Sequence, residues 1–266
     1  MNAAGPRLRG AGARWRRRCG WTAWYAGLRL AGGIGLAGVL AGCATTGATR
    51  GDPLEGFNRG VFAFNEALDT ALLKPLATGY QALLPEIVRT GVDNFFDNLV
   101  DAWSAVNHLL QGKPVEATEM GVRFGMNTFI GLGGLLDVAS DAGLERRSED
   151  FGQTLGRWGL GPGPYIMLPL LGPSTVRDTA ALVLDWRATP VAMLHESRDR
   201  VPLAVLQVIS TRARLLSVTR AIEEIAIDKY ALIRDGFLAR RRNQVYDGDP
   251  PDEPPPPEAE DDPPPK

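Results

Sequence analysis

The segment of residues 158–176 constrains the fold of this chain more than any other part. It reads WGLGPGPYIMLPLLGPSTV, 19 residues without a charged side chain between Arg157 and Arg177. Its length and polarity suit a membrane interior, yet its four prolines forbid a straight helix. Irregular backbone at membrane depth is tolerated only inside a protein or against a watery cavity. The segment is therefore predicted to lie at membrane depth beside a channel, with a buried loop across the core as the alternative.

Residues 124–136 are also uncharged and interrupted by glycines. The candidate channel or membrane-depth residues come from these two segments. They are Trp158, Tyr165, Met167, Leu168, Leu132 and Leu135. Aromatic side chains gather at membrane interfaces, so the candidate interface aromatics are Trp103, Trp158, Trp186, Tyr80 and Tyr165, each of which could equally be a core residue.

Most of the remaining body has the pattern of helices separated by proline and glycine. Asp52 is predicted to cap a first helix, with Glu55 completing a capping box and Lys74-Pro75 ending the helix. Further helices are predicted from Pro85-Glu86 to about Gly112 and again from Pro114.

One long helix is predicted from about Leu203 to Arg242. Its inward-facing residues are expected to be Leu215, Val218, Ile222 and Ile225. Sustained period-2 alternation is scarce, so the predicted fold class is all-α.

The N-terminus has the pattern of a targeting signal. Residues 1–42 carry seven arginines and no acid, and an apolar stretch of 12 residues ends at Ala41, too short for a stable span. The following Leu40-Ala41-Gly42-Cys43 is similar to the bacterial lipobox. We predict a cleaved signal peptide at 1–42, acylation of Cys43 and a lipidated linker at 43–51. In lipoproteins of Gram-negative bacteria, an Asp directly after the acylated cysteine signals retention in the inner membrane. The residue here is Ala44, which implies that the protein is sorted to the outer membrane.

Charge is distributed unevenly along the chain. Residues 43–246 carry 21 basic and 23 acidic residues, which disfavours a nucleic-acid partner. Residues 247–266 carry eight acids and nine prolines, and this composition predicts a disordered tail. A solubilising tail without a partner is the favoured interpretation.

The search for catalytic chemistry finds little. The only cysteines are Cys19 and Cys43 and the only histidines His108 and His195, too few for a Cys/His zinc site. No G-x-S-x-G motif is present. Each histidine is expected at the surface or at a helix end. The acids Glu149, Asp150, Asp137 and Asp141 are expected in solvated loops or at helix caps. No enzyme, no metal and no cofactor beyond the lipid on Cys43 are predicted.

Six strings follow one another between residues 52 and 186. They are DPLEGFNR from Asp52, NF at 94–95 through Asn107, RF at 123–124 with NT at 127–128, GLGGLLDVA from Gly131, FGQTLG from Phe151, and GPGPY from Gly161 through Leu168-Pro169 and Gly172-Pro173 to Arg177-Asp178. Each string is weak alone, but together, behind a lipobox, they resemble the MlaA (VacJ) family of outer-membrane lipoproteins.

This resemblance implies a non-enzymatic role in outer-membrane lipid asymmetry. Family members are all-helical rings within the inner leaflet, and a central amphipathic channel passes misplaced phospholipids from the outer leaflet toward the periplasm. The implied partners are a trimeric porin of the OmpC/OmpF type and a periplasmic MlaC-like lipid carrier, with residues 52–246 forming the domain. Two alternatives remain open: a structural tether that transports nothing, and a periplasm-facing lipid hydrolase.

Overall fold

The computed structural model describes residues 52–188 and 197–252, and the fold within these ranges is mostly helical. The predicted signal peptide, Cys43, His195 and most of the acidic tail lie outside the described residues. The helices are α2 (Glu55–Leu68), α3 (Lys74–Leu83), α4 (Glu86–Leu110), α5 (Pro114–Phe129), α6 (Val138–Asp141), α7 (Phe151–Arg157), α8 (Val176–Ala188), α9 (Ser197–Arg214), α10 (Leu216–Ile225) and α11 (Lys229–Val245). The predicted all-α class is confirmed apart from one short hairpin.

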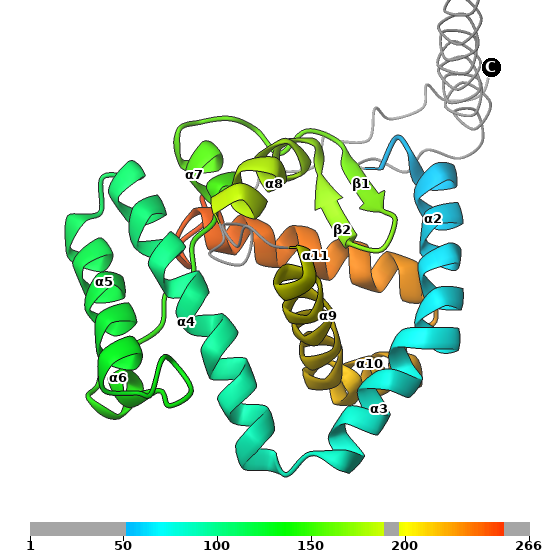
Figure 1. The fold of residues 1–266 in the computed structure, drawn as a ribbon. Coiled ribbons are helices and arrows are strands. Elements are labelled where there is room, and N and C mark those ends of the chain that lie inside the picture. Colours follow the sequence, from blue (N-terminus) through cyan, green and yellow to red (C-terminus); the bar gives the residue numbers. More distant parts are fainter. Residues whose placement is uncertain (1–51, 189–196, 253–266) are drawn as a thin grey trace, which may run out of the picture.

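That hairpin occupies the middle of the uncharged 158–176 segment. Strand β1 (Tyr165–Leu168) pairs antiparallel with β2 (Gly172–Thr175), with Tyr165 opposite Thr175 and Leu168 opposite Gly172. Figure 1 shows α2, α3 and α4 as a bent frame around α9, with α11 running across it and α5 packed outside α4. The hairpin lies at the upper end of α2 (Figure 1) and also contacts α11.

The first predicted helix differs from expectation at both ends. Asp52 is fully buried rather than a helix cap, and the helix begins at Glu55 with Leu54 in the capping position. The helical path also continues past Lys74-Pro75, through a π-helical turn at Asp69–Leu73 into α3. Pro75 directly follows the π-helical turn, in which the N–H of Lys74 bonds to the carbonyl of Asp69 five residues back, so the α-helical hydrogen-bond pattern is already interrupted where the proline lacks an N–H. The predicted starts at Glu86 and Pro114 are confirmed.

The predicted long helix from Leu203 to Arg242 is wrong as a single element. It is divided into α9, α10 and α11, with a 45° bend between α9 and α10. The second break occurs because Asp228 caps α11, accepting a hydrogen bond from the backbone N–H of Ala231 at 3.1 Å. Within the described ranges no single helix meets the length and hydropathy requirements for crossing a membrane, whereas the bent α9–α10 pair meets them together.

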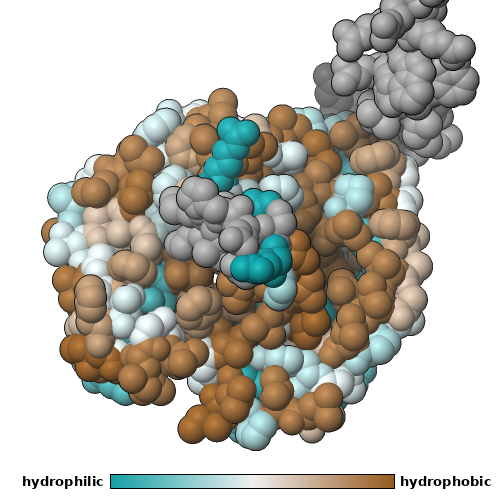
Figure 2. Space-filling view, in the orientation of Figure 1, coloured by the Kyte–Doolittle hydropathy of each residue, from teal (hydrophilic) through white to brown (hydrophobic). Residues whose placement is uncertain are grey.

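Polarity is inverted between the interior and the surface. In the described part of the chain, buried polar and charged side chains outnumber buried apolar ones, and many large apolar side chains are exposed. Figure 2 shows apolar surface over most of the visible face. The expectation that Leu215, Val218 and Ile225 face inward is therefore wrong, since all three are exposed. Phe129, at 87% exposure, and Ile87, at 78%, are further examples.

Arg123 organises the interior between α4, α5 and α6. Its side chain is fully buried and donates to Asp137 at 2.9 and 3.0 Å and to Asp101 at 3.3 Å. Arg146 donates to Asp101 as well, at 2.9 Å. Burial alone would raise the pKa of Asp137, but hydrogen bonds from Ser140, Asn127 and Arg123 lower it to about 2. The α4–α5 contact is thus stabilised by paired charges.

We expect Arg123→Met to lower the free energy of unfolding by about 3–5 kcal/mol, because it leaves the buried carboxylate of Asp101 and the half-buried carboxylate of Asp137 with fewer partners. Chemical denaturation of the purified protein in detergent measures this. Arg147→Met is the matched control, since the Arg147–Glu119 pair is largely exposed, and it should cost less than about 1 kcal/mol. Equal losses for the two variants would contradict the structural role of Arg123.

Candidate functional site

Two asparagines of α2 hold the hairpin in place. The side-chain amide of Asn58 donates to the carbonyl of Tyr165 at 3.1 Å and accepts from the N–H of Met167 at 2.8 Å. Two helical turns later, Asn65 donates to the carbonyl of Leu168 at 2.9 Å and accepts from the N–H of Leu170 at 2.8 Å. The free backbone edge of β1 is thereby satisfied by a helix instead of another strand.

The inner face of the hairpin forms an aromatic core with α11. Tyr165 packs edge-on against Tyr230 at 6.3 Å and against Phe237 at 6.2 Å between ring centroids, and Met167 lies in the same cluster. The hydroxyl of Tyr230 donates to the buried carboxylate of Asp52. The hairpin therefore has a fixed position against both α2 and α11.

Arg241 joins α11 to α7 and α8. Its guanidinium donates to both carboxylate oxygens of Asp150, each at 2.6 Å, and to both oxygens of Asp178, each at 3.0 Å. Arg177 donates to the same Asp178 at 2.9 Å. Two arginines and two aspartates thus form a balanced cluster. Burial opposes its charge, but the two carboxylates raise the pKa of Arg241.

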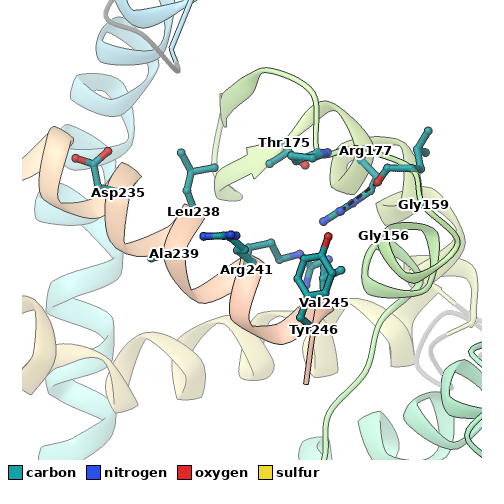
Figure 3. A pocket seen from close by; sticks show the side chains of 14 residues that line it. Gly156, Gly159, Thr175, Arg177, Asp235, Leu238, Ala239, Arg241, Val245 and Tyr246 are labelled. Atoms are coloured by element: carbon teal, nitrogen blue, oxygen red, sulfur yellow. Dashed lines mark hydrogen bonds between the residues drawn. The ribbon is translucent and has the colours of Figure 1, made fainter. Parts of the chain in front are cut away.

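A cavity of about 710 Å³ lies beside this cluster, and we call it the arginine cavity. Figure 3 shows that one side is formed by α11 and the other by Gly156, Gly159, Thr175 and Arg177, with Arg177 reaching toward Tyr246. Its polar lining includes Arg177, Arg241, Arg242, Asp235 and Tyr246. Its apolar lining includes Leu160, Pro162, Leu238, Ala239 and Val245. The cavity is amphipathic, with a size typical of ligand sites.

Glycines of α7 allow the other helices to approach this closely. A Cβ on Gly156 would lie 2.6 Å from the Arg177 Nη1 and 2.8 Å from a methyl carbon of Val245. A Cβ on Gly152 would lie 2.4 Å from the Arg241 Nη2 and 2.5 Å from Asp178. The FGQTLG string that contains both glycines is therefore needed for the cavity wall.

The residues singled out from the sequence are not gathered at this cavity. Tyr165 and Met167 are buried in the aromatic core, and Leu168 is half-buried. Trp158 is 57% exposed and donates from its indole N–H to the carbonyl of Leu110 at 2.9 Å. Leu132 and Leu135 are exposed. The 158–176 segment does contribute to the cavity, but through its residues 159–162 and Thr175.

One expectation about a single polar residue needs correction, and one is confirmed. Glu149 is buried rather than solvated, and its carboxylate accepts from Gln111 at 2.8 Å, whereas Asp150 does cap α7 as one alternative expected. His108 lies in the last turn of α4, at a helix end as expected, and its ring is buried with Nε2 at 3.0 Å from the carbonyl of Arg147. Among the described residues no group of three or more His, Cys, Asp or Glu side chains is placed to hold a metal ion.

The sequence marks Arg241 only as part of the basic run 240–242 near the end of a helix, and not as part of a site. The partners of Arg241 are 91 and 63 residues away in sequence, and no local pattern indicates them. The signals nearest to it were Arg177-Asp178 and FGQTLG, which supplied part of the family resemblance but no role in a cavity.

Comparison with known proteins identifies the family. The MlaA lipoprotein family model matches residues 50–244, which include every residue that lines the arginine cavity except Val245 and Tyr246. The chain belongs to the MlaA lipoprotein family. The expected resemblance is thereby confirmed, and it extends beyond residue 186 to include α11.

MlaA relatives are similar over most of their length. The Escherichia coli (strain K12) protein named intermembrane phospholipid transport system lipoprotein MlaA is 36% identical over 216 residues, covering 76% of this chain and 82% of that relative. The Haemophilus influenzae protein of the same name is 32% identical over 228 residues, with 79% and 87% covered. A solved structure described as the structural basis for maintenance of bacterial outer membrane lipid asymmetry matches with a TM-score of 0.65 and 36% identity, covering 73% of this chain and 98% of that one.

We expect Gly156→Ala to displace Arg177 or Val245 and to impair lipid passage through an otherwise folded protein, because the added methyl group overlaps both. Lipid transfer between membranes, scored alongside thermal unfolding, measures this. Gly125→Ala in α5 is the control, since nothing lies within 4 Å of its Cβ position, and it should be neutral or slightly stabilising. Full transfer by Gly156→Ala would remove the cavity wall from the mechanism.

Proposed function

We propose that this chain is an outer-membrane lipoprotein that removes mislocalised phospholipids from the outer leaflet and passes them to a periplasmic carrier. The observation that carries the proposal is the inverted polarity of the fold, with charged pairs inside and large apolar side chains outside. A protein in water would bury those apolar groups, whereas a protein set among lipid tails has no reason to do so. Family membership supports the same role.

The arginine cavity supports the transport step. A phospholipid that crosses a leaflet must keep its head group among polar groups while its acyl chains stay apolar. The cavity offers both kinds of group, because its lining includes the polar Arg177, Arg241 and Tyr246 as well as the apolar Leu160 and Leu238. Because Arg241 is already neutralised by two carboxylates, it supplies polarity without holding a phosphate so tightly that the lipid could not leave.

The remaining parts of the proposal rest on the lipobox and on the family resemblance. Acylation of Cys43 would anchor the chain in the membrane, because several acyl chains hold far more firmly than one. A trimeric porin of the OmpC/OmpF type would support the protein, and an MlaC-like carrier would receive the lipid. No reacting side chain is required, and the closely packed ring of His108 does not suggest one. A tether that transports nothing would have no use for an amphipathic cavity of this size.

Deleting the gene should raise the amount of phospholipid exposed at the cell surface, and restoring the wild-type chain should lower it again. Labelling of surface phospholipid with a membrane-impermeant amine reagent measures this. Restoration with Cys43→Ala should fail, because the unacylated chain would not stay at the outer membrane. Unchanged surface phospholipid after deletion would favour the tether.

Phe129→Asp should reduce the amount of protein inserted in the outer membrane, because a charge among lipid costs at least ~2–3 kcal/mol. At a water-exposed site the same change costs little. Phe129 is a sharper probe than Met167, whose burial means that a charge would disrupt the core in any surroundings. Fractionation and immunoblotting measure insertion, with Ala259→Asp in the acidic tail as the silent control. If the two variants insert equally well, this end of α5 lies in water.

A further inference from the structure

A second, smaller cavity lies on the other side of Asp150. It has a volume of about 250 Å³, is mostly apolar and is formed by α4, α8, α9 and the residues before α7. Because its lining includes two tryptophans, we call it the tryptophan cavity. Its lining includes Phe96, Leu99, Trp103, Leu182, Asp185 and Trp186. Asp150 lines it too, and Asp150 binds Arg241 of the arginine cavity. The Asp150–Arg241 ion pair therefore joins one lining residue of each cavity.

Asp185 is the polar group that distinguishes this cavity. Its Oδ1 accepts from the indole N–H of Trp103 at 2.7 Å and from the backbone N–H of Phe151 at 2.9 Å. Both donors are neutral. Across residues 52–188 and 197–252, no lysine or arginine forms an ion pair with Asp185. The other two carboxylates that line the cavity are in ion pairs, Asp150 with Arg241 and Glu149 with Lys113, whereas Arg241 acts on Asp185 only through a weaker electrostatic attraction without an ion pair.

A carboxylate that has no ion-pair partner in such surroundings favours a cationic ligand. Burial raises the pKa of Asp185, which means that its negative charge is poorly solvated. A cation bound beside it would relieve that penalty. The neighbouring aromatic rings favour an organic ammonium, because the faces of tryptophan and phenylalanine attract such cations. A divalent metal ion would need several more oxygen ligands than the one free carboxylate provides.

We propose that the tryptophan cavity binds the ammonium group of a zwitterionic phospholipid head group, with Asp185 as its counter-ion and Trp103 and Trp186 beside it. This inference rests on the proposed function and adds a head-group preference to it. The cavity is large enough for an aminoethyl group but too small for a lipid, so the acyl chains would stay outside. An anionic phospholipid without an amine would gain nothing at this site.

Native mass spectrometry of the mature, acylated protein tests the preference. The protein is released from detergent micelles that contain equal amounts of phosphatidylethanolamine and phosphatidylglycerol with identical acyl chains. The wild type should carry about fivefold more phosphatidylethanolamine, the preference expected from one cation–aromatic and carboxylate contact. N-acetylated phosphatidylethanolamine, which lacks the positive charge, should bind like phosphatidylglycerol.

Asp185→Asn is the decisive variant. The asparagine keeps an oxygen that accepts from Trp103 and Phe151 but has no charge, so the preference should fall to the micelle ratio while phosphatidylglycerol binding stays unchanged. Asp141→Asn, an equal charge change at an exposed residue of α6, should keep the preference. Should Asp185→Asn fold poorly, Trp186→Leu provides a second test, since it should lower the preference whereas Trp186→Phe should retain it.

The outcomes separate this inference from the function on which it rests. A wild type that carries both lipids in the micelle ratio, or an Asp185→Asn variant that keeps the wild-type preference, overturns the ammonium site and leaves lipid transport standing. A wild type that carries no phospholipid at all contradicts the proposed function, and the head-group site with it.

Discussion

The four hydrogen bonds from Arg241 to Asp150 and Asp178 connect three helices that are far apart in sequence. Asp150 also caps α7, and Asp178 lies in the first turn of α8, so one guanidinium fixes α11 against both. Arg123 does the same for α4, α5 and α6. Lipid tails are as apolar as leucine, so a protein among them gains little by burying leucine between its helices. Paired polar groups supply the specificity instead.

This way of building the interior also provides the route that transport requires. The polar side chains that hold the helices together also line the space between them. A polar space of this kind can accommodate the head group of a phospholipid. The arginine cavity is bordered by the same Arg177 and Arg241 that join α7, α8 and α11. The glycines at 152 and 156 bring these helices close enough for the ion pairs to form. Structure and proposed function thus depend on one set of residues.

Much of the fold was predictable from the sequence because the residues that begin or interrupt its helices act on the chain immediately around them. Pro85 and Pro114 mark helix starts, and the prolines of residues 158–176 exclude a long helix there. The direction of the apolar stripes was not predictable in the same way. Periodicity shows that Val218 and Ile225 share a face, but whether that face meets protein or lipid depends on the solvent, which a stripe does not encode. The prediction that Val218 and Ile225 face the interior assumed that the protein surface lies in water.

The site was predictable only in part. The family strings contain Asp150, Gly156 and Arg177 or adjoin them, but Arg241 lies outside those strings and meets its partners only after folding. The hairpin was missed because strands of four residues are too short to show an alternating pattern. The role of Asn58 and Asn65 was not predictable either. Both side chains bind the edge of β1 from one face of a helix, so their spacing in the sequence is helical and does not indicate a neighbouring strand.

The central claim is that the apolar exterior meets lipid while the polar interior stays wet. Spin labels on single cysteines report this directly in nanodiscs, through their relative collision rates with oxygen, which concentrates in lipid, and with a water-soluble nickel chelate. A label at Phe129 or Ile87 should collide mainly with oxygen, and a label at Gly161 in the arginine cavity mainly with the chelate. Equal access of the chelate to all three positions would mean that the exterior lies in water, and would contradict the account.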